Sequence, residues 1–328
     1  MTGTYPCEAC LGPAATPYPG ERTHMKVKSP RVRTAVIGGV AALALAVAGL
    51  AAVTLGAVGQ TSSRSAVHVA TAGRAELTAK ARTALTRYLR ENQPTVHLVK
   101  PGGVNLKAGT SSTTAVGSFN WSGYVNSSTA GAFTAVSGTW RQPATVCSPE
   151  QRLASFWVGL DGFNDATVEQ LGTTAYCFEG VPYYFTWWEM FPGASVTVGS
   201  TVRPGDLISA SVKRSGTSYT LTLVDFTTPG NSFSTVQSCP ATTCENSSAE
   251  WIAERPAFSI GITPLSFFRS WNLMRASQTS NGVQGNIGSG PSPTEIQMFD
   301  ATGTYQLDNV SGLLRGGSSF RVHWLNSY

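Results

Sequence analysis

Two short stretches of this 328-residue chain carry the side chains best suited to chemistry. The first, 157–162, is followed seven residues later by Glu169 and Gln170, and the second, 249–252, contains Glu250. An ionised Glu accepts a proton from a bound water and returns it to a leaving group. A Gln offers a carbonyl oxygen that holds water and an amide group that donates to an oxyanion. A Glu and a Gln can therefore support hydrolysis without an imidazole.

The more common catalytic sets are missing from the region 117–328. It contains a single His, His323, which alternates with apolar residues near the C-terminus and is expected to be structural. The region has no G-x-S-x-G, no H-E-x-x-H and no Asp-Thr-Gly or Asp-Ser-Gly pair. Serine, cysteine and zinc hydrolase chemistries therefore lack their general base, and we expect no metal and no cofactor.

Charge is distributed unevenly along the chain. Residues 1–116 contain 13 Lys/Arg and 4 Asp/Glu, whereas residues 117–328 contain 10 and 14, so the overall charge of +5 comes from the front segment. Most aromatic residues lie in the acidic part, away from the basic segment. A nucleic-acid site needs basic and aromatic residues together, so we expect no nucleic-acid partner.

Residues 1–59 have the composition of an export segment. Lys26, Lys28, Arg31 and Arg33 precede a charge-free run, 34–59, that ends in a small-x-small pattern. A cleaved secretory signal is the simplest interpretation. An uncleaved membrane anchor with the domain outside remains the alternative, because the run is long enough to span a bilayer. Met25 is a second possible start, which would leave residues 1–24 untranslated.

Residues 60–116 are predicted to form a pro-segment and linker. Apolar residues between 75 and 92 recur at helical spacing among Lys and Arg, which predicts one basic amphipathic helix. The part after Pro94 becomes rich in Gly, Ser and Thr, which is typical of a cleavable linker. A disordered tether is the alternative. As a pro-segment, it would be expected to inhibit the folded domain by covering an acidic cleft.

Residues 117–328 are predicted to be all-β. Segments such as 133–140, 195–202, 207–213, 219–225 and 320–324 alternate apolar with small polar residues, and Gly, Pro, Asn and Ser separate them. This pattern predicts an antiparallel two-sheet β-sandwich of concanavalin or jelly-roll type. We expect this domain to be a monomer.

Four cysteines lie in the predicted sandwich, and pairing is the default in an exported domain. The spacing of Cys239 and Cys244 favours a local disulfide, which leaves Cys147 to pair with Cys177. Other connectivities stay open.

Seven blocks in the region 117–328 together resemble one known family, the glutamic peptidases or eqolisins. They occur in the family's order at 120–124, 136–143, 157–162, 169–172, 187–192, 204–206 and 249–252. The resemblance implies a two-sheet sandwich around a substrate cleft and an acid-active endopeptidase. It implies Gln170 and Glu250 as the catalytic pair. The alanine-rich signal and basic pro-region are typical of bacterial, secreted members.

The resemblance also suggests which residues surround the pair. Asp161 and Glu189 are candidates to tune the Glu pKa, and Trp121, Trp157 and Trp187 resemble the aromatic residues of the family's substrate groove. Each also has an ordinary structural interpretation, as turn chemistry or as sandwich core. Fungal relatives have a tyrosine where this chain has Phe191, so a hydroxyl is missing from the expected cleft wall.

A different class of function remains as the alternative. Secreted β-sandwiches that bind carbohydrate also have Trp-rich grooves and few charges, and a glycosidase would need two carboxylates about 5 to 10 Å apart. Glu169, Glu189 and Glu250 are the candidates for that role. Gln170 and the predicted pro-segment favour a peptidase that acts on polypeptides.

Overall fold

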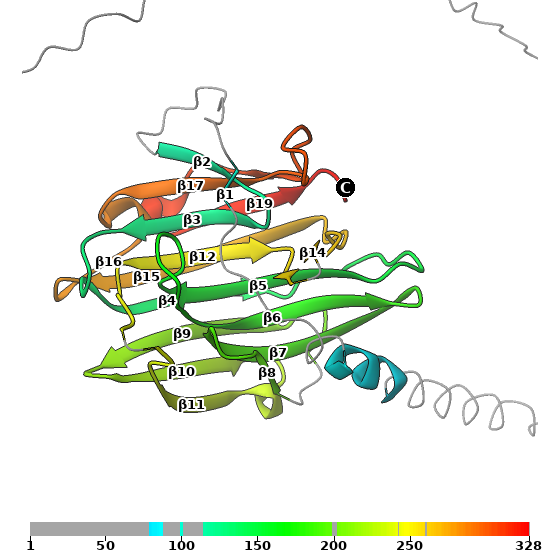
Figure 1. The fold of residues 1–328 in the computed structure, drawn as a ribbon, viewed down its shortest axis with the longest axis horizontal. Coiled ribbons are helices and arrows are strands. Elements are labelled where there is room, and N and C mark those ends of the chain that lie inside the picture. The colour runs from blue at the N-terminus through cyan, green and yellow to red at the C-terminus, as the bar shows by residue number, and fades with distance from the viewer. Residues whose placement is uncertain are drawn as a thin grey trace, which may run out of the picture. The chain divides into compact units, whose positions relative to one another are not determined.

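The structure, a computed structural model, describes residues 79–87, 99–100, 114–198, 202–241, 243–259 and 261–327. This part of the chain contains two large β-sheets and one helix at 79–87 (Figure 1). The predicted export segment and most of the predicted pro-segment lie outside the described residues. Within the described ranges, no helix has the length and apolar content needed to cross a membrane.

The first sheet contains nine strands in the order β1-β2-β17-β3-β12-β5-β6-β7-β8. Their bounds are β1 Val99–Lys100, β2 Thr114–Ser118, β3 Trp121–Ser127, β5 Arg152–Leu160, β6 Val168–Phe178, β7 Val181–Phe191, β8 Val196–Val198, β12 Ser248–Glu254 and β17 Pro293–Met298. Neighbouring strands are antiparallel except β2 and β17, which are parallel. The predicted antiparallel sandwich therefore holds with this one exception. The strand predicted at 195–202 is described only as β8, since residues 199–201 are not described.

The second sheet contains eight strands, in the order β11-β10-β9-β4-β15-β19-β18, with β16 paired to β15. Their bounds are β4 Phe133–Arg141, β9 Leu207–Ser215, β10 Ser218–Asp225, β11 Phe233–Ser238, β15 Ser270–Ser280, β16 Val283–Gly285, β18 Asp308–Val310 and β19 Phe320–Trp324. A small pair, β13 Ala257–Phe258 and β14 Gly261–Ile262, follows β12. Three short 3-10 helices occupy loops at Pro229–Asn231, Ile287–Ser289 and Arg315–Gly317.

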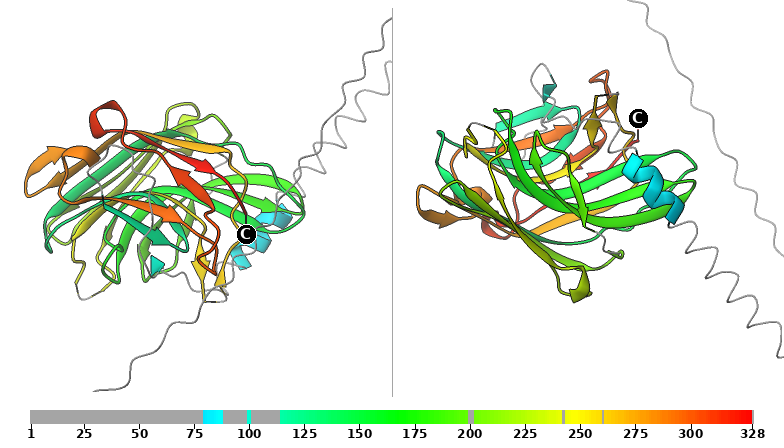
Figure 2. Two further views of the ribbon diagram at one scale, coloured as in Figure 1. Left: turned by 90° about the horizontal axis from the view of Figure 1, so that it is seen from above. Right: turned by 60° about the horizontal axis from the view of Figure 1, so that its bottom comes forward.

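The main hydrophobic core lies between the two sheets, which form the two layers visible in Figure 2. Aromatic side chains from both layers meet there: the ring of Trp271 on β15 lies 5.5 Å from that of Phe156 on β5 and 6.0 Å from that of Trp140 on β4. Such rings bury large apolar areas and also prefer these tilted and edge-on geometries. The core thus fixes which face of each strand points outward.

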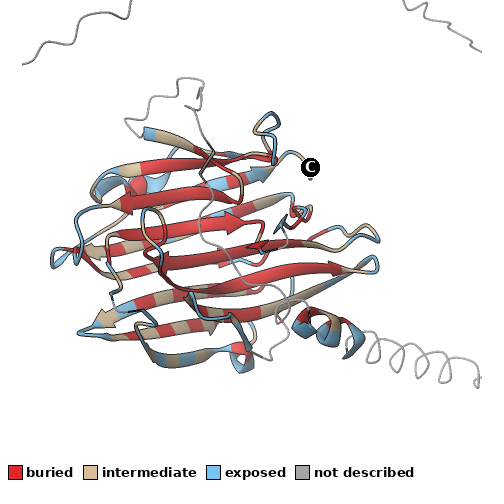
Figure 3. Cartoon of the chain, in the orientation of Figure 1, coloured by how far each residue is buried: buried red, intermediate tan, exposed pale blue. Residues whose placement is uncertain are grey.

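The central strands of the nine-stranded sheet are buried on both faces (Figure 3). On β12, Trp251 belongs to the core between the sheets, whereas Ile252 packs in a second cluster on the outer face with Trp121 and Trp157. Because side chains alternate along a strand, Glu250 and Glu254 share the outer face with Ile252. That outer face carries the site described below.

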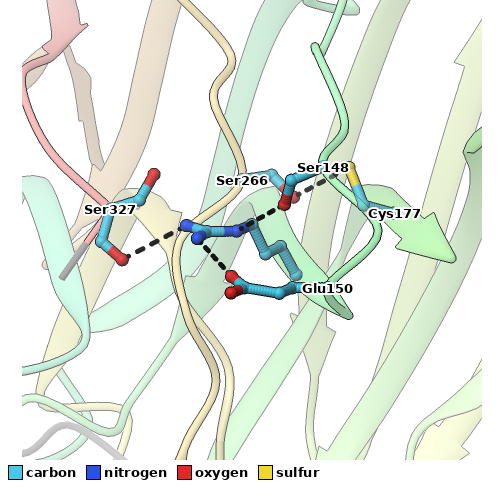
Figure 4. Close-up of polar contacts among 6 residues, drawn as sticks. Ser148, Glu150, Cys177, Ser266 and Ser327 are labelled. Atoms are coloured by element: carbon cyan, nitrogen blue, oxygen red, sulfur yellow. Dashed lines mark hydrogen bonds and ion pairs between the residues drawn. The ribbon is translucent and has the colours of Figure 1, made fainter. Parts of the chain in front are cut away.

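Two disulfides brace the sandwich, in the pairing that the cysteine spacing favours. Cys147 is bonded to Cys177 and Cys239 to Cys244, with Cα–Cα distances of 5.4 and 5.9 Å. The first joins the loop before β5 to the end of β6. Figure 4 shows that end of the sheet, where Ser266 donates a hydrogen bond from its hydroxyl to the Cys177 sulfur at 3.7 Å.

Candidate active site

Strand register on the outer face brings the candidate polar residues into rows. Gln170 on β6 lies directly opposite Glu189 on β7, and on its other side lies opposite Gly159 of β5. Gly159 in turn lies opposite Glu250 of β12. Glu254, four residues further along β12, pairs with Ser155 of β5. Directly paired residues point to the same face, so all these side chains share the outer face.

A pocket opens on this face and encloses about 610 Å³, including its solvent-filled mouth. Its polar side chains include Gln170, Glu189 and Glu254, and its aromatic walls include Trp121 and Trp187. The remaining lining residues are mainly apolar or small: Leu153, Ser155, Val168, Thr174, Phe185, Phe191, Ser195, Pro256, Ala257 and Phe258. A mostly apolar cleft with a few converging polar groups is typical of a binding or catalytic site.

Gln170 is held by Glu189. The Gln170 amide nitrogen donates a hydrogen bond to a Glu189 carboxyl oxygen at 2.6 Å, and the Gln170 carbonyl oxygen accepts none from the described residues. Burial, together with the nearby charge of Glu254, raises the pKa of Glu189 to about 8, although the hydrogen bond from Gln170 opposes this rise. The effect of Glu254 on Glu189 indicates that both carboxyls and the carboxamide form one interacting group.

Glu254 is buried yet well supplied with hydrogen-bond donors. The Trp157 indole N–H donates to one carboxyl oxygen at 2.8 Å, and the Asn120 amide lies 3.5 Å from the other. Burial raises the pKa of Glu254 to about 7, and hydrogen bonds from Trp157, Trp121 and Asn120 oppose that rise. Its carboxyl group is therefore protonated in acid and ionises near neutrality.

Comparison with known proteins gives the family. The model of the peptidase A4 family matches residues 119–313. The chain belongs to the peptidase A4 family. It is therefore a glutamic peptidase, an enzyme that hydrolyses peptide bonds, and this membership decides against the carbohydrate-binding alternative. Among curated proteins, no match is found.

Solved structures agree with the fold of this glutamic peptidase. Scytalido-glutamic peptidase, crystallised with a transition-state analogue inhibitor, is 23% identical with a TM-score of 0.54, and SCP-B, an eqolisin solved with the tripeptide Ala-Ile-His, is also 23% identical with a TM-score of 0.51. Each match covers 63% of this chain and 98% of the other. At this level of identity the similarity shows the common fold.

Glu250 does not line the pocket of this glutamic peptidase. It is fully buried, and neither carboxyl oxygen accepts a hydrogen bond within the described structure. Burial raises its pKa well above the usual range; the nearby Ser248 hydroxyl opposes this rise, and the charge of Asp161 adds to it. Of the two residues expected to form the catalytic pair, Gln170 lines this pocket and Glu250 does not.

The Trp157 indole lies over Gly159, the residue between Glu250 and Gln170 in the row. A Cβ at Gly159 would lie 3.0 Å from the six-membered part of this indole. Its indole N–H reaches across to the neighbouring strand β12 and donates to the Glu254 carboxyl. Trp157 thus fills the space over Gly159 and helps to orient Glu254, the other acid on this face of β12.

Asp161 also lies away from the pocket lining. Its carboxylate accepts hydrogen bonds from the backbone N–H groups of Asn246 at 2.6 Å and Ser247 at 2.7 Å, which anchors the segment leading into β12. Its backbone φ of 68° belongs to the tight turn before Gly162. Burial raises its pKa to about 6. It acts on Glu250 and Glu169 electrostatically rather than on the pocket acids.

Sequence reasoning missed Glu254. The available signal was strand alternation: once Glu250 and Ile252 are assigned to one face of β12, Glu254 must share it. The other predicted groove residues divide between lining and floor. Trp121 and Trp187 line the pocket, whereas Trp157 is fully buried and packs edge-on against Trp121, with ring centroids 4.9 Å apart.

Proposed function

We propose that this eqolisin is a secreted, acid-active endopeptidase in which Gln170 and Glu254 act on one water molecule. One observation carries the proposal: a single pocket contains this carboxamide, hydrogen-bonded to Glu189, and the buried carboxyl of Glu254. Glu254 takes the role that the family resemblance suggested for Glu250. Two groups of this kind supply general acid–base chemistry and a donor for the developing oxyanion.

The raised pKa of Glu254 favours a neutral carboxyl as the proton carrier. Its O–H donates a proton to the substrate carbonyl oxygen, while its other oxygen accepts a proton from the attacking water. The water oxygen bonds to the carbonyl carbon, giving a neutral diol and leaving Glu254 protonated. In the second step a diol hydroxyl returns a proton to Glu254, Glu254 protonates the amine nitrogen, and the C–N bond breaks. Every proton is accounted for without an imidazole.

Gln170 positions the reactants in this scheme. Its amide group has two N–H donors, of which one goes to Glu189. The second can donate to the substrate oxygen, and the free carbonyl oxygen can accept from the attacking water. One such donor contributes about 3 kcal/mol at a transition state. A carboxamide does not titrate, so this contribution persists in acid.

The proposal includes export and maturation. Two disulfides are typical of an oxidising, extracellular environment, and eqolisin membership agrees with that location. We infer a signal in 1–59, a pro-segment in 60–116 that inhibits the sandwich domain of 117–328, and a monomeric mature enzyme. The inferred pro-segment contains β1 and the first three residues of β2, which extend the first sheet of the sandwich. Polypeptides are the substrates of this domain.

The test is a protein-degradation assay on the acid-treated full chain, with denatured casein as substrate, across about pH 2 to 7. Wild type, Gln170→Ala and Glu254→Gln are compared, each with and without an aspartic-peptidase inhibitor. We expect acid activity that resists the inhibitor and is lost in both variants. Full activity of Glu254→Gln would exclude Glu254 as the proton carrier.

A further inference from the structure

The outer face that carries Gln170 continues beyond the pocket as an aromatic surface. Leu153 on β5, Tyr176 on β6 and Tyr183 on β7 lie in one row, and Phe178 follows two residues further along β6. Tyr176 is six residues from Gln170 on the same strand, so the two point to the same face about 20 Å apart. We call Leu153, Tyr176, Phe178 and Tyr183 the aromatic platform.

Helix 79–87 covers this platform. Leu85 and Ala81, four residues apart on one side of the helix, are 6% and 2% exposed, and Leu85 packs in a cluster with residues of the platform. At the edge, the Lys80 ammonium lies 2.7 and 2.9 Å from the two oxygens of Glu179, and 5.9 Å from the centre of the Phe178 ring. Leu85 and the ion pair of Lys80 with Glu179 thus hold the helix against the platform.

Helix 79–87 is short enough to be displaced from the platform. Helices of nine residues are not stable alone in water, so this one depends on its contact with the platform. Its ion pair is exposed on both sides, and exposed pairs stabilise little. The platform beneath it is apolar and would be left uncovered without the helix.

The platform is also continuous with the pocket. Leu153 belongs to both, and Phe185 lines the pocket while packing against the cluster that contains Leu85. A polypeptide bound in the pocket and extended along the strands would reach the platform after about six residues, at about 3.4 Å per residue. The same surface therefore suits the helix and a distant part of a substrate.

We propose that the aromatic platform is a docking surface for an extended apolar stretch of substrate polypeptide, and that helix 79–87 competes for it as an intramolecular ligand. This inference rests on the proposed peptidase function for the identity of its ligand. It predicts that long apolar substrates gain affinity when the helix is released.

The experiment measures binding rather than cleavage. The full chain carrying Glu254→Gln is combined with Leu85→Asp, which places a carboxylate in the apolar contact, or with Thr83→Asp, which places the same group on the exposed side of the same helix. The probes are two labelled twelve-residue peptides, one of Leu, Phe and Ala and one of Ser and Gly. Fluorescence anisotropy gives the Kd, mass spectrometry verifies that the peptides stay intact, and circular dichroism verifies the β fold.

We expect Leu85→Asp to lower the Kd of the apolar peptide about tenfold relative to Thr83→Asp, with no such change for the Ser/Gly peptide. Adding Phe178→Ser and Tyr183→Ser should reverse that gain, whereas Phe226→Ser, an exposed aromatic in the loop after β10, should not. Equal Kd values for Leu85→Asp and Thr83→Asp would overturn the competition. A gain that survives loss of Phe178 and Tyr183 would overturn the platform as the docking site.

Failure of the proposed function would look different. If Glu254→Gln still cleaved the peptides, the assignment of Glu254 as the proton carrier would be wrong. Docking could then still be measured with peptides of D-amino acids, which resist cleavage. If catalysis depended on Glu254 but the Kd values did not separate, the docking surface would be wrong and the catalytic assignment would stand.

Discussion

At the scale of single residues, Glu250 and Glu254 lie on the same face of β12 but have different surroundings. Glu254 receives an indole hydrogen bond at 2.8 Å and lines the pocket, whereas Glu250 is fully buried and does not line it. Burial raises the pKa of both carboxyls because it disfavours the charged form. Glu254 can therefore exchange protons with a ligand in the pocket, whereas Glu250 is not placed to do so.

This contrast gives a matched pair of variants. Glu254→Gln should lower kcat by about a thousandfold or more, because the group that carries the proton is lost. Glu250→Gln is the control with the same chemistry on the same strand face, and kcat should stay within about threefold of wild type. Single-turnover kinetics on a chromogenic peptide measures both. The reverse pattern would return the role to Glu250.

The pH dependence of the enzyme should follow Glu254. Since the protonated form is the active one and its pKa is about 7, kcat/KM should fall about tenfold per pH unit above pH 7. Trp157→Phe removes a hydrogen bond that favours the charged carboxylate, so the pKa should rise and the falling limb should move up by about one pH unit. Trp187→Phe, a pocket indole, should leave the limb in place. A rate that instead increases through pH 7 would indicate an ionised base.

At the scale of elements, much of the sheet can be predicted from the sequence. Alternation along 207–213, 219–225 and 320–324 identifies strands that the structure contains as β9, β10 and β19. Alternation also places Gln170 on a definite face of its strand. It cannot tell which acid of β12 reaches the pocket, because alternation assigns Glu250 and Glu254 to the same face.

The glycine two residues after Gln170 has an explanation at this scale. A Cβ at Gly172 would lie 2.2 Å from the Phe156 carbonyl oxygen and 2.7 Å from the Trp157 Cβ, so only glycine lets β5 and β6 approach here. Gly172→Ala should therefore lower the free energy of unfolding by about 1–3 kcal/mol and disturb the indole that holds Glu254. Urea unfolding together with kcat measures the two effects.

A second glycine provides the control for that experiment. A Cβ at Gly312 would meet no atom within 4 Å, so Gly312→Ala should leave the free energy of unfolding and kcat close to the wild-type values. If Gly172→Ala were as stable and as active as Gly312→Ala, the close approach of β5 and β6 would not be what demands glycine.

At the scale of the whole molecule, the sandwich buries an unusual number of carboxyl groups. Burial raises the pKa of Glu169 to about 10, of Glu189 to about 8, of Glu254 and Asp308 to about 7, and raises that of Glu250 as well. Glu169 faces the opposite side of β6 from Gln170, so carboxyls with a raised pKa are also found outside the pocket. Sequence composition cannot reveal it, because the acidic residues of 117–328 look like an ordinary solvated set until their burial is known.

These carboxyls should make the enzyme more stable in acid than near neutrality. Unfolded Asp and Glu have pKa values of about 4, so between about pH 4 and 8 the folded state holds protons that the unfolded state has released. Stability is then fully present below about pH 4 and is lost as pH rises through the folded pKa values. Each group contributes up to about 1.4 kcal/mol per pH unit in that window. The melting temperature, measured by calorimetry, should fall steadily from pH 4 to pH 8.

Buried carboxyls that take no part in the proposed reaction can show what causes the fall of the melting temperature with pH. Glu169→Gln and Glu250→Gln replace two buried carboxyls by amides that do not titrate. The melting temperature of this double variant should therefore fall less steeply with pH. Glu179 is an exposed acid, so Glu179→Gln should leave the slope unchanged. A melting temperature that rises from pH 4 to pH 8 would contradict the assignment. Since Glu254 needs its proton for the proposed reaction and the sandwich needs the same kind of protons for stability, activity and folding should decline over the same pH range.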